Sequence, residues 1–285
     1  INYSYDGAGN LQNKYEQVVD PNYGYPTGTQ NGNTYEYTDT SWKDKLTKIN
    51  GDNITYDANG NPLTYRDGMT FEWENGRILK KISTSDKSVQ MSYDSNGMRT
   101  QKTVDGVKTN YYYDSNKNLI ALVKGNDTLL FYYDSDGSAT SFSYNGTMYF
   151  YVKNLQGDVI RIIDLAGTEV ASYVYDAWGN IKDTKGDPTV RELNPIRYRG
   201  YVYDTETGLY YLQSRYYDPF AGRFLNADAY YDTCNSVLST NMFAYCESDP
   251  INYIDPYGYA SYKNSYRYNK SSKTYNITTK INIMW

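Results

Sequence analysis

Residues 88–118, SVQMSYDSNGMRTQKTVDGVKTNYYYDSNKN, contain two copies of one short pattern. Tyr93-Asp94 and Tyr113-Asp114 each open a polar stretch that carries Asn, and Tyr133-Asp134 follows after the same interval of 20 residues. Trp73-Glu74 stands one interval earlier. A fixed interval of this size is typical of proteins built from stacked structural repeats. The sequence therefore predicts a structural repeat protein.

Each copy of the pattern predicts a β-hairpin. Met91 and Tyr93 alternate with polar neighbours, as in a strand with one buried face. Residues 94–97 then supply a turn, because Asp can accept hydrogen bonds from its own downstream backbone and Asn and Gly tolerate positive φ. Asp105-Gly106 marks the next reversal. We therefore predict an all-β fold, in which short antiparallel strands form a meander.

Weaker copies of the pattern extend the array in both directions. They are Tyr5-Asp6, Tyr56-Asp57, Tyr175-Asp176 and Tyr203-Asp204. Residues 15–45, with clustered Gly, Asn and Thr, interrupt the pattern, and we expect a long loop there. We expect a helical turn only within residues 217–225 and 235–245.

The composition fits half-exposed aromatic strands and excludes several kinds of active site. The 285 residues include 37 Tyr and no His. Tyr favours strands, and its ring can cover apolar surface while its hydroxyl reaches a polar partner. The lack of histidine excludes Ser-His-Asp and Cys-His nucleophiles, His-ligated zinc and His general bases. We expect no cofactor and no metal.

The two cysteines, Cys234 and Cys246, leave two interpretations open. A metal site would need two further ligands, and no recognisable spacing supplies them. A disulfide between the two requires an oxidising compartment and suitable geometry. Two buried thiols are the favoured interpretation, and the disulfide is the alternative.

Charge and hydropathy argue against two classes of partner. The formal net charge is -5 and no basic block occurs, so nucleic acid is not expected as an obligatory partner. No apolar run approaches the roughly 20 residues that a membrane-spanning helix needs. The sequence begins at Ile1 within the repeat pattern, so we expect it to be a fragment, and its lack of a signal peptide says little about export.

Residues 194–259 carry a more specific series of motifs. In order they are NPIRYRGY (194–201), RYYDP (215–219), GRFL (222–225) and DPYG (255–258). This series resembles the repeat-associated core of the RHS family in its bacterial form. The tyrosine–aspartate pairs resemble the YD repeats of the same family, so the resemblance covers nearly the whole chain.

The resemblance implies a spiralling antiparallel β-sheet that forms a hollow shell, with the core segment curled inward as a plug. It implies three units: a YD-repeat hairpin array (1–193), the plug (194–259) and a short variable C-terminal tail (260–285). In this family the sequence beyond the core is often a toxin held inside. The expected partners are therefore the upstream YD repeats of the parent chain and an encapsulated C-terminal toxin or peptide. The expected location is the surface or the medium of a bacterium.

The residues of the core motif are expected to have structural roles. They are Arg215, Tyr217, Asp218, Pro219, Gly222, Arg223, Asp255, Pro256 and Gly258. Pro219 ends a strand, because proline cannot donate to a sheet. Asp218 and Arg223 are expected to pair across the turn that follows.

Some members of the family cleave themselves just beyond the aspartate-proline-x-glycine motif, through two aspartates. Close carboxylates push one pKa upward, so a pair can share a proton and activate water. Asp228 falls at the position of the first aspartate, and the scissile bond would be Tyr259-Ala260. Ala227 stands where self-cleaving members often carry Arg, and Thr240 where the second aspartate is expected. The alternatives for the second carboxylate are Asp218, Asp232 and Asp249.

The tail is too short to bury a sizeable core, although residues 274–278 and 280–283 alternate as strands do. The leading hypothesis is therefore a non-catalytic one, the C-terminal end of a YD-repeat shell. One alternative is an aspartic-type peptidase that releases its own tail after Tyr259. The other is a module that binds cell-surface carbohydrate through exposed tyrosines.

Overall fold

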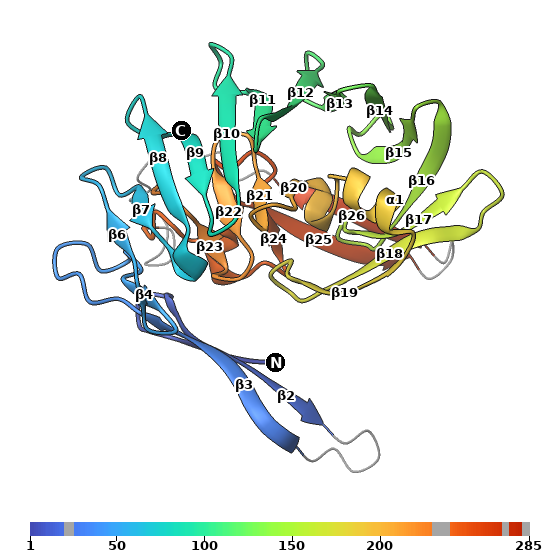
Figure 1. Ribbon diagram of the computed structural model, residues 1–285. Helices are drawn as coiled ribbons and strands as arrows, with labels where there is room; N and C mark the ends of the chain where they lie inside the picture. The colour runs from blue at the N-terminus through green and yellow to red at the C-terminus, as the bar shows by residue number, and fades with distance from the viewer. Residues whose placement is uncertain (20–25, 230–239, 270–273, 281–285) are drawn as a thin grey trace.

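The computed structural model describes residues 1–19, 26–229, 240–269 and 274–280, and it consists mainly of antiparallel β-sheet. The strands form four sheets, of 5, 14, 4 and 3 strands. The largest sheet curves over a smaller inner group of strands (Figure 1). The predicted all-β fold is confirmed, and the division into units at 193/194 and 259/260 remains a prediction.

The 14-stranded sheet, called the long sheet below, runs in strict sequence order from β6 to β19. Each strand therefore pairs with its neighbours in the sequence, as the meander predicts. Its strands are β6 (Thr55–Tyr56), β7 (Pro62–Thr64), β8 (Thr70–Glu74), β9 (Ile78–Ser83), β10 (Ser88–Tyr93), β11 (Arg99–Val104), β12 (Val107–Tyr113), β13 (Leu119–Lys124), β14 (Asp127–Tyr133), β15 (Ala139–Tyr144), β16 (Thr147–Lys153), β17 (Val159–Asp164), β18 (Glu169–Tyr175) and β19 (Ile181–Gly186).

In most of the tyrosine–aspartate pairs, the aspartate builds the turn that follows it. Between β10 and β11, Asp94 Oδ1 accepts hydrogen bonds from the backbone N–H groups of Asn96 and Met98, each at 2.9 Å. The same two bonds recur at Asp6, Asp57, Asp114, Asp134 and Asp176. The predicted turn chemistry is thus confirmed along the array.

In several of these pairs, the tyrosine ties its hairpin to the preceding one. The hydroxyl of Tyr133 donates to the carbonyl of Leu119 at 2.8 Å, and that of Tyr113 to the carbonyl of Arg99 at 3.0 Å. Each acceptor is the first residue of the strand that follows the previous turn. The repeat interval therefore has a physical cause at these hairpins, because each tyrosine meets a carbonyl at the equivalent place in the preceding hairpin.

The first sheet corrects the expectation of a loop over residues 15–45. Its strands are β1 (Asn2–Tyr5), β2 (Leu11–Val19), β3 (Pro26–Glu36), β4 (Lys48–Ile49) and β5 (Asp52–Asn53). β2 and β3 form a hairpin that projects away from the rest of the chain (Figure 1). Glycine and asparagine lower strand propensity, but ladder bonds are made by backbone groups, which every non-proline residue supplies.

The four-stranded sheet lies in the plug, and the three-stranded sheet pairs one strand of the plug with two strands of the tail. The strands are β20 (Val202–Asp204), β21 (Leu209–Tyr211), β22 (Tyr216–Asp218) and β23 (Arg223–Phe224), then β24 (Tyr253–Ile254), β25 (Tyr262–Asn269) and β26 (Thr274–Lys280). Of the helical turn expected within 217–225, β22 and β23 occupy the two ends, and residues 219–222 between them form one turn, in which the Gly222 N–H donates to the Asp218 carbonyl at 2.8 Å. In the second segment where a helical turn was expected, residues 235–245, the described residues 240–245 form turns, and residues 235–239 lie outside the described residues. The predicted strand at 274–278 is confirmed, while 281–283 are not described.

Helix α1 (Pro188–Leu193) was not expected from the sequence. Asp187 caps it by accepting a hydrogen bond from the Thr189 N–H at 2.7 Å, and proline occupies the first position, where no donor is needed. Tyr173 on β18 donates to the Arg191 carbonyl at 3.0 Å and holds the helix on the long sheet. Within the described ranges, no helix has the length and apolar character to span a bilayer.

The long sheet and the plug share one core. Phe71, Ile82 and Val89 of the long sheet pack in the same cluster as Leu209 and Leu225 of the plug. The core therefore lies between the concave face and the plug.

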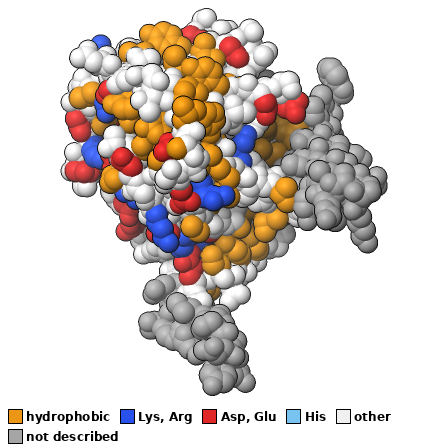
Figure 2. All heavy atoms as spheres, turned by 90° about the vertical axis from the view of Figure 1, so that its right-hand side faces the viewer, with side chains coloured by type: hydrophobic (Ala, Val, Ile, Leu, Met, Phe, Trp, Pro, Cys, Tyr) orange, Lys and Arg blue, Asp and Glu red, His pale blue; other side chains and the backbone are white. Residues whose placement is uncertain are grey.

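Part of the outer face is apolar. Tyr112, Leu130 and Tyr132, on β12 and β14, are 50%, 41% and 42% exposed. Figure 2 shows hydrophobic side chains gathered over the upper part of the face it presents.

The first sheet meets the last turn of the long sheet beside the plug. Lys14 on β2 lies 2.5 Å from Asp176 in the β18–β19 turn, and both side chains are buried. Tyr3 packs edge-on against Trp178 at 6.2 Å between ring centroids. Residues 162 apart in the sequence are thereby brought together.

Candidate functional site in the plug

The plug is held to the long sheet by buried ion pairs, of which the most enclosed is Arg99–Asp204. Nη1 and Nη2 of Arg99 donate to the Asp204 carboxylate at 2.5 and 3.1 Å, and the two side chains are 0% and 3% exposed. The rings of Tyr111 and Tyr211 lie against the guanidinium, with centroids at 4.6 and 4.4 Å. Lys102 adds a bond to Asp204 at 2.8 Å. Buried charges are tolerated only with such partners, so these contacts fix the position of the plug.

The partners of Asp204 also set its protonation. Burial alone would raise the pKa of Asp204, but Arg99 and Lys102 outweigh it and hold the pKa below its usual value. Although Tyr203-Asp204 reads as a repeat copy, its aspartate pairs with a distant arginine. It thus serves the plug rather than a hairpin turn of the long sheet.

A second ion pair corrects an expected contact. Asp218 does not pair with Arg223 but accepts two hydrogen bonds from Arg66, at 2.8 Å from Nε and 3.0 Å from Nη2. Arg223 lies opposite Asp218 in the β22–β23 ladder, yet it donates to the Tyr37 hydroxyl at 3.1 Å and to the Asp44 carbonyl at 2.5 Å. The planar fork of Arg66 reaches both oxygens of Asp218, which favours this two-bond pairing.

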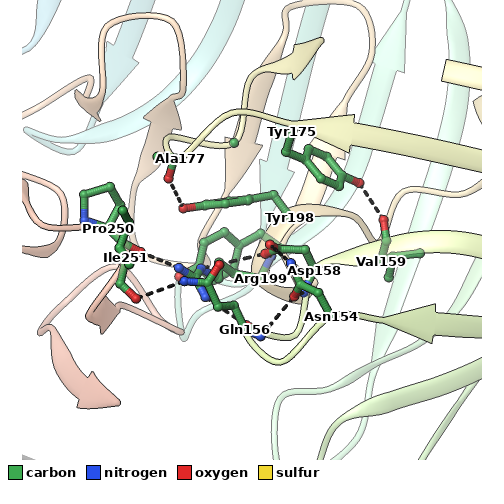
Figure 3. A network of polar contacts seen from close by, with 12 residues as sticks. Asn154, Gln156, Asp158, Val159, Tyr175, Ala177, Tyr198, Arg199, Pro250 and Ile251 are labelled. Carbon is green, nitrogen blue, oxygen red and sulfur yellow. Dashed lines mark hydrogen bonds and ion pairs between the residues drawn. The ribbon is translucent and has the colours of Figure 1, made fainter. Parts of the chain in front are cut away.

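Arg199 makes a third contact, near the β16–β17 turn (Figure 3). Its guanidinium donates to the carbonyl oxygens of Gln156, at 3.0 Å, and of Pro250. Its backbone N–H donates to Asp158 Oδ1 at 2.9 Å. Gln156 Nε2 in turn donates to the Ile251 carbonyl at 3.0 Å. One arginine thus joins the long sheet to two separate segments of the plug.

Asp228, the candidate catalytic aspartate, is bound to a buried arginine. Nη2 of Arg215 lies 2.7 Å from Asp228 Oδ2 and 3.6 Å from Asp255 Oδ2. Nε of Arg215 donates to the Gly258 carbonyl at 2.6 Å, and the Phe224 ring centroid lies 3.6 Å from the guanidinium carbon. Arg215 therefore gathers two carboxylates next to the predicted scissile bond.

Asp255 holds the backbone on both sides of that bond. Its Oδ1 accepts hydrogen bonds from the N–H groups of Gly258 at 2.8 Å, Tyr259 at 3.1 Å and Ala260 at 3.3 Å. The Ala260 N–H belongs to the Tyr259-Ala260 peptide itself. Burial raises the pKa of Asp255 to about 6, although Arg215 and the N–H donors favour the charged form.

Asp255, the carboxylate that shares Arg215 with Asp228, was not among the partners predicted from the sequence. Of those partners, Asp218 pairs with Arg66, and Asp249 accepts hydrogen bonds from Asn252. Asp232 lies outside the described residues. Asp255 is part of the motif that precedes the cut, and an aspartate that opens a turn commonly accepts bonds from the following N–H groups. That turn chemistry was the available signal.

A cavity of about 260 Å³ adjoins Asp228 and Tyr259. Trp73, Leu79 and Tyr93 of the long sheet line it on one side. Its volume exceeds the roughly 30 Å³ that one water occupies in the liquid, so it has room for water beside the scissile bond.

The arrangement has the parts of a carboxyl-based acid–base site. Two carboxylates at one guanidinium can share a proton, with one acting as acid and the other as base. Asp255, with a pKa of about 6, changes protonation state near neutral pH. The geometry therefore allows attack by water on a backbone carbonyl at this place.

Two more motif residues connect the plug to the last hairpin turn of the long sheet. The Tyr217 hydroxyl donates to the Trp178 carbonyl at 2.7 Å. The Pro219 carbonyl accepts a bond from Asn180 Nδ2 at 2.6 Å.

The motif glycines lie where a side chain does not fit. A Cβ on Gly222, whose φ is 66°, would come within 2.9 Å of the Trp178 ring. A Cβ on Gly258, whose φ is 73°, would lie 2.6 Å from Ser214 Oγ. Pro256 lies in the turn that Asp255 organises, where its ring fixes φ.

Cys246 is a buried free thiol, and burial raises its pKa well above the usual value. Cys234 lies outside the described residues. A raised pKa suppresses the thiolate, so Cys246 acts as a packing residue.

Comparisons with known proteins agree with the resemblance found in the sequence. The family model described as Teneurin YD-shell matches residues 1–251. The tRNA3(Ser)-specific nuclease WapA of Bacillus spizizenii is 37% identical over 268 residues, and the tRNA nuclease WapA of Bacillus subtilis is 36% identical over 268. Each alignment covers 91% of this chain and 11% of the relative, so the chain spans about a tenth of their length.

Among solved structures, the Photorhabdus luminescens Tc holotoxin pore matches with a TM-score of 0.66 and 18% identity, over 90% of this chain and 13% of that one. The TcdB2–TccC3 crystal structure matches with a TM-score of 0.58 and 18% identity, over 90% and 16%. These structures share the fold of this chain.

Proposed function

Because the chain belongs to the Teneurin YD-shell family and forms part of a β-sheet shell, we propose that it seals one end of that shell and holds a C-terminal cargo behind its plug. The plug's attachment supports this most: ion pairs tie it to the early, middle and late parts of the long sheet and its connections, at Arg66, Arg99 and Asp158. A segment fixed along the whole sheet can close it. The tail continues from the plug, because β25 pairs with β24.

We propose that the parent protein is a bacterial polymorphic toxin or cell-contact protein that acts at the cell surface or in the medium. The support is the similarity to Bacillus proteins named as tRNA nucleases. Because the match spans 11% of their length, nuclease activity is assigned to those proteins and not to this segment. The cargo proposed here is a toxin-type domain of unspecified chemistry, and the upstream YD repeats are the proposed structural partner.

A cell-surface glycan is the weaker candidate partner. Motif tyrosines such as Tyr113 and Tyr133 donate their hydroxyls to backbone carbonyls, so they are not available for sugars. Tyr112 and Tyr132, which face outward, are the residues that a glycan array with Tyr→Ala variants would test.

Thiol labelling of two neighbouring residues on β14 tests the closed shell. Leu129 is 4% exposed and faces the core, whereas Leu130 is 41% exposed. We expect the Leu130→Cys variant to react quickly with a maleimide and the Leu129→Cys variant to react only through rare opening, slower by orders of magnitude. Equal rates would show that the plug does not cover the concave face.

We propose self-cleavage at Tyr259-Ala260 as a second function. It is favoured by one observation: Asp255 accepts a bond from the Ala260 N–H and shares Arg215 with Asp228. Water adds to the Tyr259 carbonyl carbon as one carboxylate takes its proton and the other carboxyl protonates the carbonyl oxygen. The Ala260 nitrogen then takes a proton and leaves as an amine, and Tyr259 keeps the new carboxyl group.

Intact mass measured between about pH 4 and 8 tests this reaction. We expect fragments 1–259 and 260–285 from the natural sequence, and an uncut chain from Asp228→Asn and from Asp255→Asn, because both carboxyls are required. A single unchanged mass for the natural sequence would leave the plug as architecture alone.

A further inference from the structure

The cavity beside the scissile bond is built by two parts of the molecule that are distant in sequence. The long sheet contributes Trp73, Arg77 and Tyr93, from β8 to β10 and the turn between β8 and β9. The plug contributes Asp228 and Tyr259. The plug alone therefore does not make the site.

Arg77 of the long sheet makes a hydrogen bond to the residue that precedes Asp228. Its Nη2 donates to the Ala227 carbonyl at 2.7 Å, and Ala227 directly precedes Asp228 and is 6% exposed. On the other side of the same residue, the Asp228 N–H donates to the Met242 carbonyl at 2.8 Å. The backbone before Asp228 is thus fixed by the long sheet, and the backbone at Asp228 by the plug.

The side chain of Asp228 needs this placement. Its Oδ2 lies 2.7 Å from Nη2 of Arg215, and the same nitrogen lies 3.6 Å from Asp255. A shift of the 227–228 peptide would change the distance between the two carboxylates, and displacement by about 1 Å can slow an enzymatic reaction roughly 100-fold.

We propose that Arg77 is a positioning residue for self-cleavage, so that the site is complete only when the plug is docked on β8–β10. The inference rests on the self-cleavage proposed above. It makes the cut follow closure: the Tyr259-Ala260 bond breaks after the long sheet has received the plug. A cargo beyond Ala260 is then released from the chain only inside a closed shell.

The test is the rate of cleavage, measured by intact mass, in the natural sequence and in Arg77→Ala, Arg77→Lys and Lys81→Ala. We expect Arg77→Ala to cut roughly 10- to 100-fold more slowly. Arg77→Lys should recover part of the rate, because an ammonium can still donate to the Ala227 carbonyl although it lacks the guanidinium fork. Lys81→Ala is the matched control, since Lys81 lies on the neighbouring β9 and pairs with exposed Glu72.

Thermal unfolding and an Arg66→Ala variant separate positioning from general loss of docking, because Arg66 anchors the plug through Asp218. If the natural sequence is cut and Arg77→Ala is cut at the same rate, the proposed role of Arg77 is overturned, while self-cleavage itself stands. Equal slowing in Arg66→Ala and Arg77→Ala at equal loss of melting temperature, with no recovery in Arg77→Lys, also overturns it. An uncut natural sequence overturns the self-cleavage reaction, and the role of Arg77 with it.

Discussion

The long sheet and the plug are held by opposite kinds of contact. In the long sheet, the bonds from Tyr113 to Arg99 and from Tyr133 to Leu119 each span 14 residues and recur along the chain. In the plug, Arg99–Asp204 spans 105 residues and Arg66–Asp218 spans 152, and each occurs once. Repeated local bonds can build a sheet of any length, whereas single distant pairs decide where it is closed.

The two regions also differ in how their charges are placed. Lys81 and Glu72, on the outer face of the long sheet, form an ion pair with 29% and 59% of their side chains exposed. Arg99 and Asp204 are 0% and 3% exposed. Water screens the first pair, so it contributes little, whereas removing Arg99 leaves the buried charge of Asp204 with one ion-pair partner instead of two.

The largest expected effect comes from removing the buried charge. Arg99→Met should lower the free energy of unfolding by about 3–5 kcal/mol, because the full charge of Asp204 is then held by Lys102 alone. Lys81→Met should lower it by less than about 1 kcal/mol. Urea unfolding of both variants measures the difference, and similar small losses would show that the plug does not depend on its ion pairs.

The regular half of this comparison could be predicted from the sequence. The aspartates that follow Tyr93, Tyr113 and Tyr133 predict the turns, because their side chains bond the backbone of the next few residues. The residues that predict each hairpin therefore lie within that hairpin or at a fixed interval from it. The β2–β3 hairpin was missed because its polar, glycine-containing strands lack that signal. Helix α1 was missed although Asp187 and Pro188 form a recognisable helix start.

The candidate site could be predicted only in part. Asp228 and the bond after Tyr259 came from the motif series, and both lie at one cavity. The second carboxylate, Asp255, and the sheet residue Arg77 were missed, because their approach depends on how the plug folds against β8–β10. No spacing in the sequence predicts a contact between residues that are 150 positions apart, such as Arg77 and Ala227.

The next largest effect is a pH dependence of stability that comes from a buried carboxyl group of the plug. Asp255 in the plug has a folded-state pKa of about 6, above the ordinary aspartate value of 3.8, because burial disfavours its charge. A raised carboxyl pKa means that the folded state binds the extra proton, so its contribution to stability is full below about pH 4 and is lost as pH rises through 6. One pKa unit corresponds to about 1.4 kcal/mol, so the loss is at most a few kcal/mol.

Asp255→Asn removes that titration while keeping an oxygen for the N–H groups of the turn. We expect its free energy of unfolding to fall less between pH 4 and 7 than that of the natural sequence, in urea titrations at each pH. Parallel profiles for Asp255→Asn and the natural sequence would contradict the buried titration.

Two adjacent tyrosines on β14 test the repeated bond of the long sheet. Tyr133→Phe removes the hydroxyl that bonds the Leu119 carbonyl, which should cost about 1 kcal/mol. Tyr132→Phe, at a half-exposed neighbour, should be close to neutral. Thermal or urea unfolding of the two variants gives the net contribution of one such bond. Equal losses of stability would show that the tyrosine ring, and not its hydroxyl, stabilises the repeat.

The smallest effect is expected at a hairpin aspartate, where the comparison becomes sharpest. Asp114 and Asp204 both follow a tyrosine, but Asp114 Oδ1 accepts two backbone N–H bonds, at 2.8 Å each, while Asp204 neutralises Arg99. Asparagine keeps the acceptor of Asp114, so Asp114→Asn should cost less than about 0.5 kcal/mol. Asp204→Asn keeps the shape but removes the charge, and should cost several kcal/mol. The two substitutions are chemically identical, so a different cost in urea unfolding shows that the position in the fold decides the role of the aspartate. A similar cost for both would contradict this.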